Sequence, residues 1–351
     1  MFQFLIVIRP LGLLYGSAGA FLSPENLVGR SGAKFPPDAG ALSGLILAEN
    51  QEQQFTDHQE LKTNLTVAGA FWAQADHPEN FFVPIPRSRI VGEKNPDFDE
   101  WELINHQWQR PRPDINPSYQ WQSINSWHKP TAQLKRPEQG NLNDVGQPPW
   151  KFLPILHPYL KEEERHVRDE DGLFLENAVQ MREDSCLVYL STHKLPDGWY
   201  RFGGESHLVQ ITSREIPEHS SIYQLLRQKI GRSFALITPA VWGNNNLSTR
   251  YPHHEHFNNQ RPEMLTDRPV PFRYRLGKGD RSKSSVLGIG RYAVPAGTVY
   301  VLKHDLNRTW WDFPNEWFPQ SKGQRHSPNH TLLKQLGCGL CLPITIKGVE
   351  E

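Results

Sequence analysis

The sequence predicts an α+β fold of two tandem ferredoxin-like (RRM-like) domains, each a split βαββαβ unit, with long loop insertions. A chain of 351 residues is long enough for about two domains. Its 29 prolines and 26 glycines favour turns and short strands over long helices. Strand and helix signals also occur in each half in an order that suits such a unit. We therefore expect one domain over residues 1–185 and a second over residues 186–351.

The first half shows the order strand, helix, strand, strand. The expected elements are a strand at 2–11, a helix that begins at 37–38, and strands at 65–72 and 81–86. A glycine-rich loop separates the first strand from the helix. A helix N-terminus beside such a loop would suit a phosphate, although the local pattern by itself favours a plain β-loop-α unit. The candidate phosphate contacts here are Lys34, Pro37, Gly40 and Ala41.

Residues 95–150 are polar and rich in proline and aromatic residues, and we interpret them as an insertion in the first domain. The aromatic residues are typical either of base-stacking platforms or of anchors that attach an irregular loop to the protein body, and the second interpretation is favoured. The stretch 161–184 is acidic, with nine Asp or Glu against four Lys or Arg. Because carboxylates repel phosphate, we expect Glu162, Glu163 and Glu170 on a surface that faces protein or solvent.

The second half shows the order strand, strand, helix, strand, without a visible sequence repeat. The expected elements are strands at 187–190 and 208–211, a helix at 222–230 and a strand at 234–237. Residues 268–308 form the one strongly basic segment, with nine Lys or Arg and two Asp. Cations on a glycine-rich loop with aromatic neighbours suit a phosphate backbone and unstacked bases, and a solvated loop is an equal alternative. The candidate RNA contacts of this segment are Arg273, Arg275, Lys278, Arg281, Lys283 and Arg291.

Gly337 and Gly339 lie between an amphipathic run and an apolar, β-branched run near the C-terminal end. Without a Cβ atom they let the chain turn sharply and let another molecule approach the peptide groups. For a lone G-x-G, a plain turn is nevertheless the better interpretation. Cys338 and Cys341 form a C-x-x-C, but neither a thioredoxin-like context nor a second ligand pair accompanies it. We therefore expect small apolar residues in a tight turn, and no redox or zinc site.

A series of short motifs, in the order in which they occur along the chain, makes the sequence resemble the RAMP superfamily of CRISPR effector proteins. Within that superfamily it most resembles the third subunit of the Cmr-type (type III-B) complex. The motifs are 35–37 with 40–41, Gly69 and Phe71 with Phe82, Pro84 and Pro86, 164–167 with 172–174, 203–205, Leu236 with 238–240, 293–300, and 337–339 with Pro343. The runs at 203–205 and 293–300 are the more specific. The resemblance spans nearly the whole chain except 95–150 and 242–266.

That resemblance implies a non-catalytic RNA-binding subunit that binds the repeat-derived 5′ tag of the CRISPR RNA (crRNA) in antiviral, RNA-guided defence. It implies contacts with the large polymerase-like subunit and the first backbone subunit, and it implies no cofactor. The RNA-facing places would be the glycine loop at Gly337 and Gly339, the turn at Gly203 and Gly204 with His207, and the helix start at residues 37–41. The family tends to carry an Asp- and Arg-rich pattern where this chain has residues 11–15. A tag-binding subunit of another type III subtype therefore stays open.

Two other interpretations rest on histidines. A relative in the superfamily cuts CRISPR precursor RNA with a general acid/base histidine, and His166, His207 and the cluster at 253–256 are the candidates here. None has a paired Tyr, Lys or second His at a recognisable spacing. A metal enzyme would use His253, His254, Glu255 and His256, but proline and asparagine neighbours are typical of a polar surface loop. We expect neither activity, and no bound metal.

The net charge of zero means that any nucleic-acid site is a local patch. The apolar run at 1–8 has no positive residues before it and is interrupted by Arg9 and Pro10, which is typical of a buried strand and not of a signal peptide. No apolar stretch approaches the roughly 18 residues of a membrane span. We therefore expect a soluble, cytoplasmic protein without a membrane partner.

Overall fold

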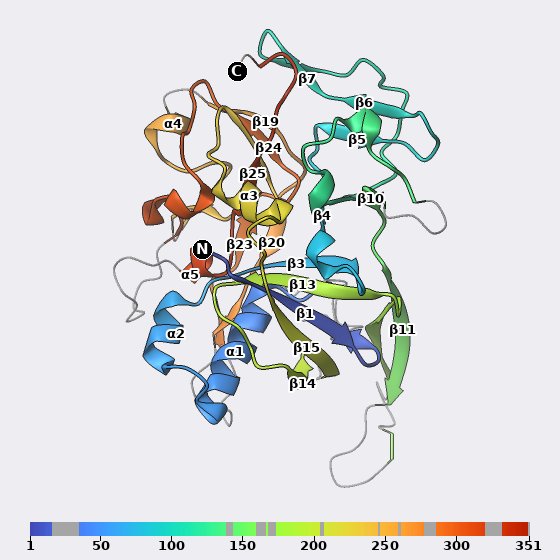
Figure 1. Ribbon diagram of the computed structural model, residues 1–351, viewed down its shortest axis with the longest axis vertical. Coiled ribbons are helices and arrows are strands. Elements are labelled where there is room, and N and C mark those ends of the chain that lie inside the picture. The colour runs from blue at the N-terminus through green and yellow to red at the C-terminus, as the bar shows by residue number, and fades with distance from the viewer. Residues whose placement is uncertain are drawn as a thin grey trace.

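The computed structural model describes residues 1–15, 35–137, 143–158, 166–167, 173–203, 207–244, 246–258, 261–276, 286–319 and 332–349. Within these ranges strands outnumber helices, and the strands pair antiparallel throughout (Figure 1). The α+β class predicted from the sequence is confirmed. No helix in this described part of the chain is both long and apolar enough to cross a membrane.

The largest sheet has eight strands, with the N-terminal strand β1 inside it. In spatial order they are β10 (Val145–Gly146), β9 (Trp121–Ser123), β4 (Phe82–Pro84), β3 (Val67–Gln74), β13 (Ser185–Ser191), β1 (Phe4–Pro10), β15 (His207–Glu215) and β14 (Gly198–Phe202). Ile6 of β1 lies opposite Tyr189 on one side and Ser213 on the other. The strands expected at 187–190 and 208–211 therefore belong to this sheet and not to a second unit, so the sheet extends past the domain boundary predicted at residue 185.

A second sheet has four strands. In spatial order they are β19 (Glu263–Leu265), β24 (Val299–Val301), β16 (Ser233–Leu236) and β25 (Cys341–Pro343). A three-stranded sheet contains β11 (Trp150–Pro158), β12 (Leu173–Met181) and β2 (Leu14–Tyr15). Two-stranded ribbons pair β5 (Arg89–Val91) with β6 (Phe98–Glu100), β7 (Glu102–Ile104) with β8 (Gln107–Gln109), β17 (Trp242–Gly243) with β18 (Ser248–Thr249), β20 (Val270–Phe272) with β23 (Arg291–Ala293), and β21 (Arg275–Leu276) with β22 (Val286–Leu287).

The two main sheets share one pairing order. In the largest sheet β1, β3, β13 and β15, taken in chain order, lie side by side as β3-β13-β1-β15. In the second sheet β16, β19, β24 and β25 lie as β19-β24-β16-β25. In both cases the spatial order is therefore second, third, first and fourth.

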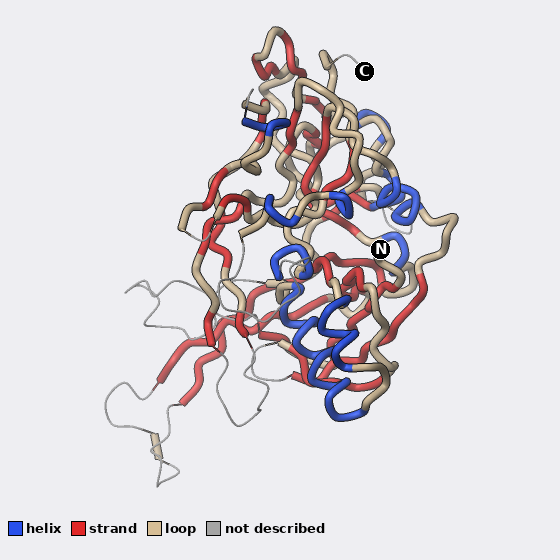
Figure 2. Tube along the Cα trace, turned by 90° about the vertical axis from the view of Figure 1, so that its left-hand side faces the viewer, coloured by secondary structure: helices blue, strands red, loops and turns tan. Residues whose placement is uncertain are grey.

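The described helices are short apart from the first. They are α1 (Ala39–Gln53), α2 (His58–Asn64), α3 (Ser221–Arg227), α4 (Glu255–Asn258) and α5 (Leu332–Gln335). Leu42 and Ile46 of α1 pack with Ile6 and Ile8 of β1, so α1 covers one face of the largest sheet (Figure 2). The helix start predicted at 37–38 is confirmed, since Asp38 is the N-cap residue.

The other face of the largest sheet packs against the second sheet. Leu5 and Val7 of β1 lie in one buried cluster with Leu225 of α3 and with Leu236 and Trp242. Burial of this apolar surface provides most of the free energy that joins the two halves of the protein.

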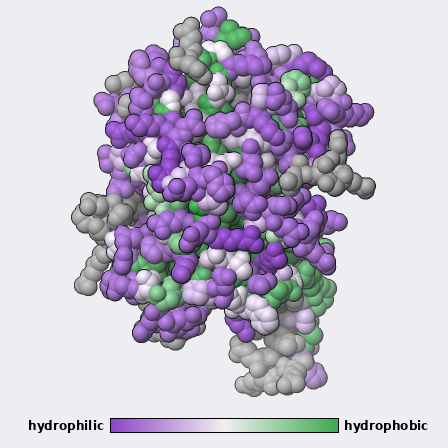
Figure 3. All heavy atoms as spheres, viewed as in Figure 1, coloured by the Kyte–Doolittle hydropathy of each residue, from purple (hydrophilic) through white to green (hydrophobic). Residues whose placement is uncertain are grey.

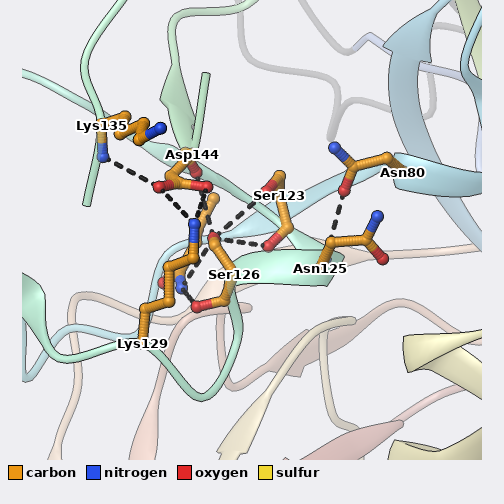
Figure 4. Close-up of polar contacts among 8 residues, drawn as sticks. Asn80, Ser123, Asn125, Ser126, Lys129, Lys135 and Asp144 are labelled. Atoms are coloured by element: carbon orange, nitrogen blue, oxygen red, sulfur yellow. Dashed lines mark hydrogen bonds and ion pairs between the residues drawn. The ribbon is translucent and has the colours of Figure 1, made fainter. Parts of the chain in front are cut away.

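Residues 95–150, predicted as an insertion, are attached to the protein body, and β9 and β10 from this stretch are strands of the largest sheet. Trp127 is 1% exposed, and its indole N–H donates to the carbonyl of Pro343 at 2.8 Å. Asp144 accepts hydrogen bonds from Lys129 Nζ and from the backbone N–H of Lys135, each at 3.0 Å (Figure 4). The interpretation of the aromatic residues as anchors is therefore confirmed for Trp127.

The strands β11 and β12 form an arm that projects from the body (Figures 1 and 2). Its exposed apolar side chains include Phe152, Leu156 and Leu173, of which the last two are each 59% exposed. Hydrophobic residues gather over this arm in the space-filling view (Figure 3). The acidic residues Glu162, Glu163 and Glu170 lie outside the described residues.

We predict that Asp144→Ala destabilises the protein by about 1–3 kcal/mol, because it leaves two donors of the insertion without their buried acceptor. The measurement is the midpoint of urea unfolding, with Asp114→Ala as the control. Asp114 also forms an ion pair in the insertion, with Arg112, but both side chains are exposed. Little change is expected for the control. Equal effects of the two substitutions would contradict the prediction.

Candidate nucleic-acid interface

Three of the predicted contact places lie around Tyr15, at the end of β2. Gly203 has a φ of +80°, and a Cβ atom on it would lie 3.1 Å from the carbonyl oxygen of Tyr15 and 3.8 Å from Cγ of Pro37. The rings of Tyr15 and His207 stack with their centroids 4.8 Å apart. The turn after β14, the first residue of β15 and the residues before α1 therefore meet at one place, which we call the Tyr15 site.

The start of α1 offers peptide N–H groups at this site, although that of Ala41 donates to the carbonyl oxygen of Asp38 at 2.8 Å. The Asp38 side chain accepts no capping hydrogen bond from the helix, and the first turn contains no acidic residue. Ala41 is exposed and Gly40 is partly exposed. A helix N-terminus carries unsatisfied N–H groups and a partial positive charge, and both favour an anion.

Tyr189 fixes the chain just before this helix. Its buried hydroxyl donates to the carbonyl oxygen of Pro37 at 2.6 Å. Complete burial raises the pKa of Tyr189 well above its usual value, so the phenol keeps its proton and stays a donor. No sequence motif marks Tyr15 or Tyr189, because both reach the site only through pairing of distant strands.

His207 brings an unused hydrogen-bonding atom to the Tyr15 site. Its Nε2 atom is buried and has no partner among the described residues. Buried polar atoms are nearly always paired, so an unpaired one is a place where a ligand group can bind. His207 thus stacks on Tyr15 and has a buried ring nitrogen without a partner among the described residues.

The glycine loop lies close to the Tyr15 site but is buried. Gly337 has a φ of +66°, and a Cβ atom on it would lie 2.5 Å from Cβ of Ala68, while one on Gly339 would lie 2.5 Å from the Trp242 ring. The N–H of Gly339 donates to the carbonyl of Pro239, and the N–H of Gly337 to that of Lys334. The groups that approach these glycines are therefore parts of the same chain, and their N–H groups are already used. The loop still adjoins α1, since Leu336 Cδ1 lies 3.8 Å from the Cβ position of Gly40.

The basic segment contributes two arginines that bind backbone carbonyls. Arg291 is buried and donates to the carbonyl of Asn244 at 2.8 Å, and burial lowers the pKa of its guanidinium. Arg273 donates to the carbonyl of Gly288 at 2.8 Å. Arg275 lies in β21, and its side chain is not described. The remaining predicted contacts lie outside the described residues: Lys34, Gly204, Lys278, Arg281 and Lys283.

The histidine and cysteine candidates are dispersed. His166 is exposed, and His254 packs on the Trp317 ring with centroids 5.2 Å apart. No group of three His, Cys, Asp or Glu residues within the described ranges is arranged to bind a metal ion. Cys338 and Cys341 are buried and form no disulfide, and burial raises the pKa of Cys341 well above its usual value. A high pKa disfavours the thiolate that redox or metal chemistry requires.

A family model described as "CRISPR-associated protein (Cas_Cmr3)" matches residues 17–345. The chain belongs to this family. The resemblance to the third subunit of the Cmr-type (type III-B) complex is confirmed, and with it the assignment to the RAMP proteins of type III CRISPR effectors. No curated protein matches the chain.

Solved structures resemble this chain only distantly. A chain of the Type III-B Cmr-beta bound to cognate target RNA is 11% identical with a TM-score of 0.48, and the match covers 85% of this chain and 86% of that chain. A chain of the Csm3-Csm4 subcomplex in the type III-A CRISPR-Cas interference complex is 8% identical with a TM-score of 0.40, covering 86% and 94%. A chain of the Csm1-Csm4 cassette in complex with pppApA is 10% identical with a TM-score of 0.39, covering 99% of each. Similarity at this level carries no argument about the site.

We predict that Gly337→Ala lowers the free energy of unfolding by about 2–4 kcal/mol, because alanine disfavours a positive φ and its methyl group would overlap Ala68. Gly44→Ala is the matched control. Gly44 lies in α1, and a Cβ atom there would meet nothing within 4 Å. The control should raise stability by about 0.5–1 kcal/mol, because alanine favours a helix interior. Urea unfolding of both variants checks the prediction, and an unchanged midpoint for Gly337→Ala would contradict it.

Proposed function

We propose that this protein is a non-catalytic RNA-binding subunit of a type III-B CRISPR effector that binds the repeat-derived 5′ tag of the crRNA. The observation that carries the proposal is the Tyr15 site, together with membership of the Cas_Cmr3 family. In this role the subunit takes part in antiviral defence in the cytoplasm.

The chemistry of the Tyr15 site suits one phosphate and one adjacent polar group of RNA. The start of α1 attracts a phosphate through the partial positive charge of the helix N-terminus, which the carboxylate of the N-cap residue Asp38 opposes. The buried Nε2 atom of His207, whose ring stacks on Tyr15, has no partner among the described residues, and in this proposal it bonds a ribose hydroxyl or a base edge. The glycine at 203 lets the backbone of Tyr15 lie close to the turn after β14, and in this proposal it shapes the site.

The other predicted contacts divide into two groups. Gly337, Gly339, Arg273 and Arg291 are engaged within the protein, and in this proposal they shape the surroundings of the RNA. The remaining positions stay proposed RNA contacts beside the Tyr15 site: Lys34, Gly204, Arg275, Lys278, Arg281 and Lys283.

We also propose that the two main sheets belong to two ferredoxin-like units. The shared order of second, third, first and fourth strand supports this, as does a helix between the first and second strand in each, α1 and α4. The passage from one unit to the other then lies between β15 and β16.

The proposed protein partners are the large polymerase-like subunit and the first backbone subunit of the effector. The β11–β12 arm supports a protein partner, because Phe152, Leu156 and Leu173 expose apolar surface on a projecting element. Contiguous exposed apolar surface of this kind marks interaction sites in soluble proteins.

We predict that Ala41→Glu weakens binding of tagged crRNA roughly three- to tenfold, because a carboxylate in the first turn of α1 repels the phosphate. The same carboxylate stabilises a helix N-terminus, so the melting temperature should not fall. Gln51→Glu, near the other end of α1, is the matched control and should leave binding unchanged. The measurement is fluorescence anisotropy of one labelled RNA with the tag and one without it, using the protein alone and co-expressed with its proposed partners.

The same RNAs also distinguish the alternative function. RNA that stays intact, with tighter binding when the tag is present, supports the proposal. Cleavage that survives EDTA and disappears in His207→Ala would instead assign a metal-independent endoribonuclease. Equal binding of both RNAs by the protein and by the co-expressed complex would contradict tag recognition. Preference for the tag of a different type III system would support the related-subtype alternative.

A further inference from the structure

The largest sheet ends at β14, which pairs with β15 (Figure 1). Side chains alternate along both strands: Tyr200, Val209 and Ile211 are buried in the cluster that contains α1, and their neighbours point to the opposite side. We call that opposite side the outer β14–β15 face. Its side chains are Trp199, Arg201, Leu208, Gln210, Thr212 and Arg214.

The outer β14–β15 face is part of the side of the largest sheet that packs, at its central strands, against the second sheet. On the central strands the same side carries Leu5 and Val7, which are buried against the second sheet. Burial raises the pKa of the Cys186 thiol, also on this side, to about 12, and the nearby charges of Arg9 and Arg214 oppose that rise. At β14 and β15 the cover ends, since Trp199 is 70% exposed and Leu208 is 47% exposed.

The strand register brings an aromatic side chain and cations together on this face. Trp199 lies opposite Gln210, and Arg201 lies opposite Leu208. Arg201 and Arg214 are exposed, and neither makes a hydrogen bond or an ion pair with any described residue. The six side chains of the face include no carboxylate. The exposed tryptophan provides a ring on which a base can stack, and Arg201, two residues along its strand, and Arg214, four residues along β15 from its partner Gln210, provide cations for phosphates.

We propose that the outer β14–β15 face binds single-stranded RNA, with a base stacked on Trp199 and phosphates at Arg201 and Arg214. This contact goes beyond tag binding at the Tyr15 site and does not depend on it. The two places lie on opposite faces of the sheet at the same strand end, because His207 pairs with Phe202, which is buried in the cluster that contains α1, whereas Arg201 and Leu208 point to the outer face. RNA at the Tyr15 site therefore reaches this face only by passing around the end of β14 and β15.

Charge favours RNA over a protein as the occupant. A protein partner for Trp199 would have to place acidic groups at both arginines, whereas every nucleotide of RNA carries a phosphate. RNA also needs no particular sequence here, because every base has a face that can stack. Docking of a protein on this face is an outcome of the test below.

The test uses the full chain and a labelled 20-nucleotide RNA of uridines without a tag, measured by fluorescence anisotropy over a series of salt concentrations. Trp199→Ala should weaken binding by about 5- to 100-fold, because stacking of one base is lost. Arg201→Ala and Arg214→Ala should each reduce the slope of log affinity against log salt by about 0.7, the value for one phosphate contact on a single strand. Because all three side chains are exposed, the melting temperature should stay unchanged.

The matched control is Lys303→Ala, which removes an exposed cation beside β24 and should leave both affinity and salt slope unchanged. A duplex RNA of equal length should be insensitive to Trp199→Ala, since its bases are already stacked. Photo-crosslinking with 4-thiouridine RNA should place an adduct on the tryptic peptide that contains Trp199. Trp199→Ala should weaken tagged and untagged RNA equally, whereas Ala41→Glu should affect only the tagged one.

Three results would overturn the proposal. The first is untagged RNA that does not bind the wild-type chain, and the second is an affinity for untagged RNA that Trp199→Ala leaves unchanged. The third is loss of co-purification with co-expressed effector subunits in Trp199→Ala without any loss of RNA binding, which would assign this face to a protein.

Discussion

The contact of the glycine loop with β3 determines how the two sheets are joined. At Gly337 the backbone of the second half lies directly on Ala68, with no side chain between them. Thr238 fixes the turn from the other side, because its hydroxyl donates to the carbonyl of Gly337 and accepts from the N–H of Leu340. The turn therefore connects β25 to the largest sheet, and through Leu336 it adjoins the start of α1.

The local elements of the fold were predictable, and their pairing was not. The apolar run of β1 and the start of α1 at Asp38 follow from residue patterns over a few positions. The pairing of Ile6 with Tyr189 joins strands that are separated by most of the first half of the chain. No local pattern specifies such a register, because it depends on which apolar faces are buried together. The strands at 187–190 and 208–211 were therefore recognised as strands but placed in the wrong sheet.

The same limit applies to the candidate site. A pair of glycines with positive φ indicates a close approach, and the structure has one, but the approaching groups are Ala68 and Trp242 of the same chain. A sequence cannot distinguish approach by its own backbone from approach by a ligand. Tyr15 was not recognised as a site residue because a lone aromatic residue after a strand has no signature. Its role comes from tertiary contacts with Gly203 and His207.

A high density of Lys and Arg in the sequence also does not mean that these side chains are exposed together on one surface. The basic segment at 268–308 is the strongest charge signal of the sequence, yet two of its arginines, 273 and 291, donate to carbonyl groups, while Arg268 and Lys303 are exposed. A buried guanidinium needs such partners, because an unpaired charge in the interior is unfavourable by several kcal/mol. Arg201 and Arg214 lie in a stretch with no excess of basic residues, and strand alternation exposes both on one side of the sheet. Position on a face, more than density in sequence, therefore determines which arginines of this protein can meet a phosphate.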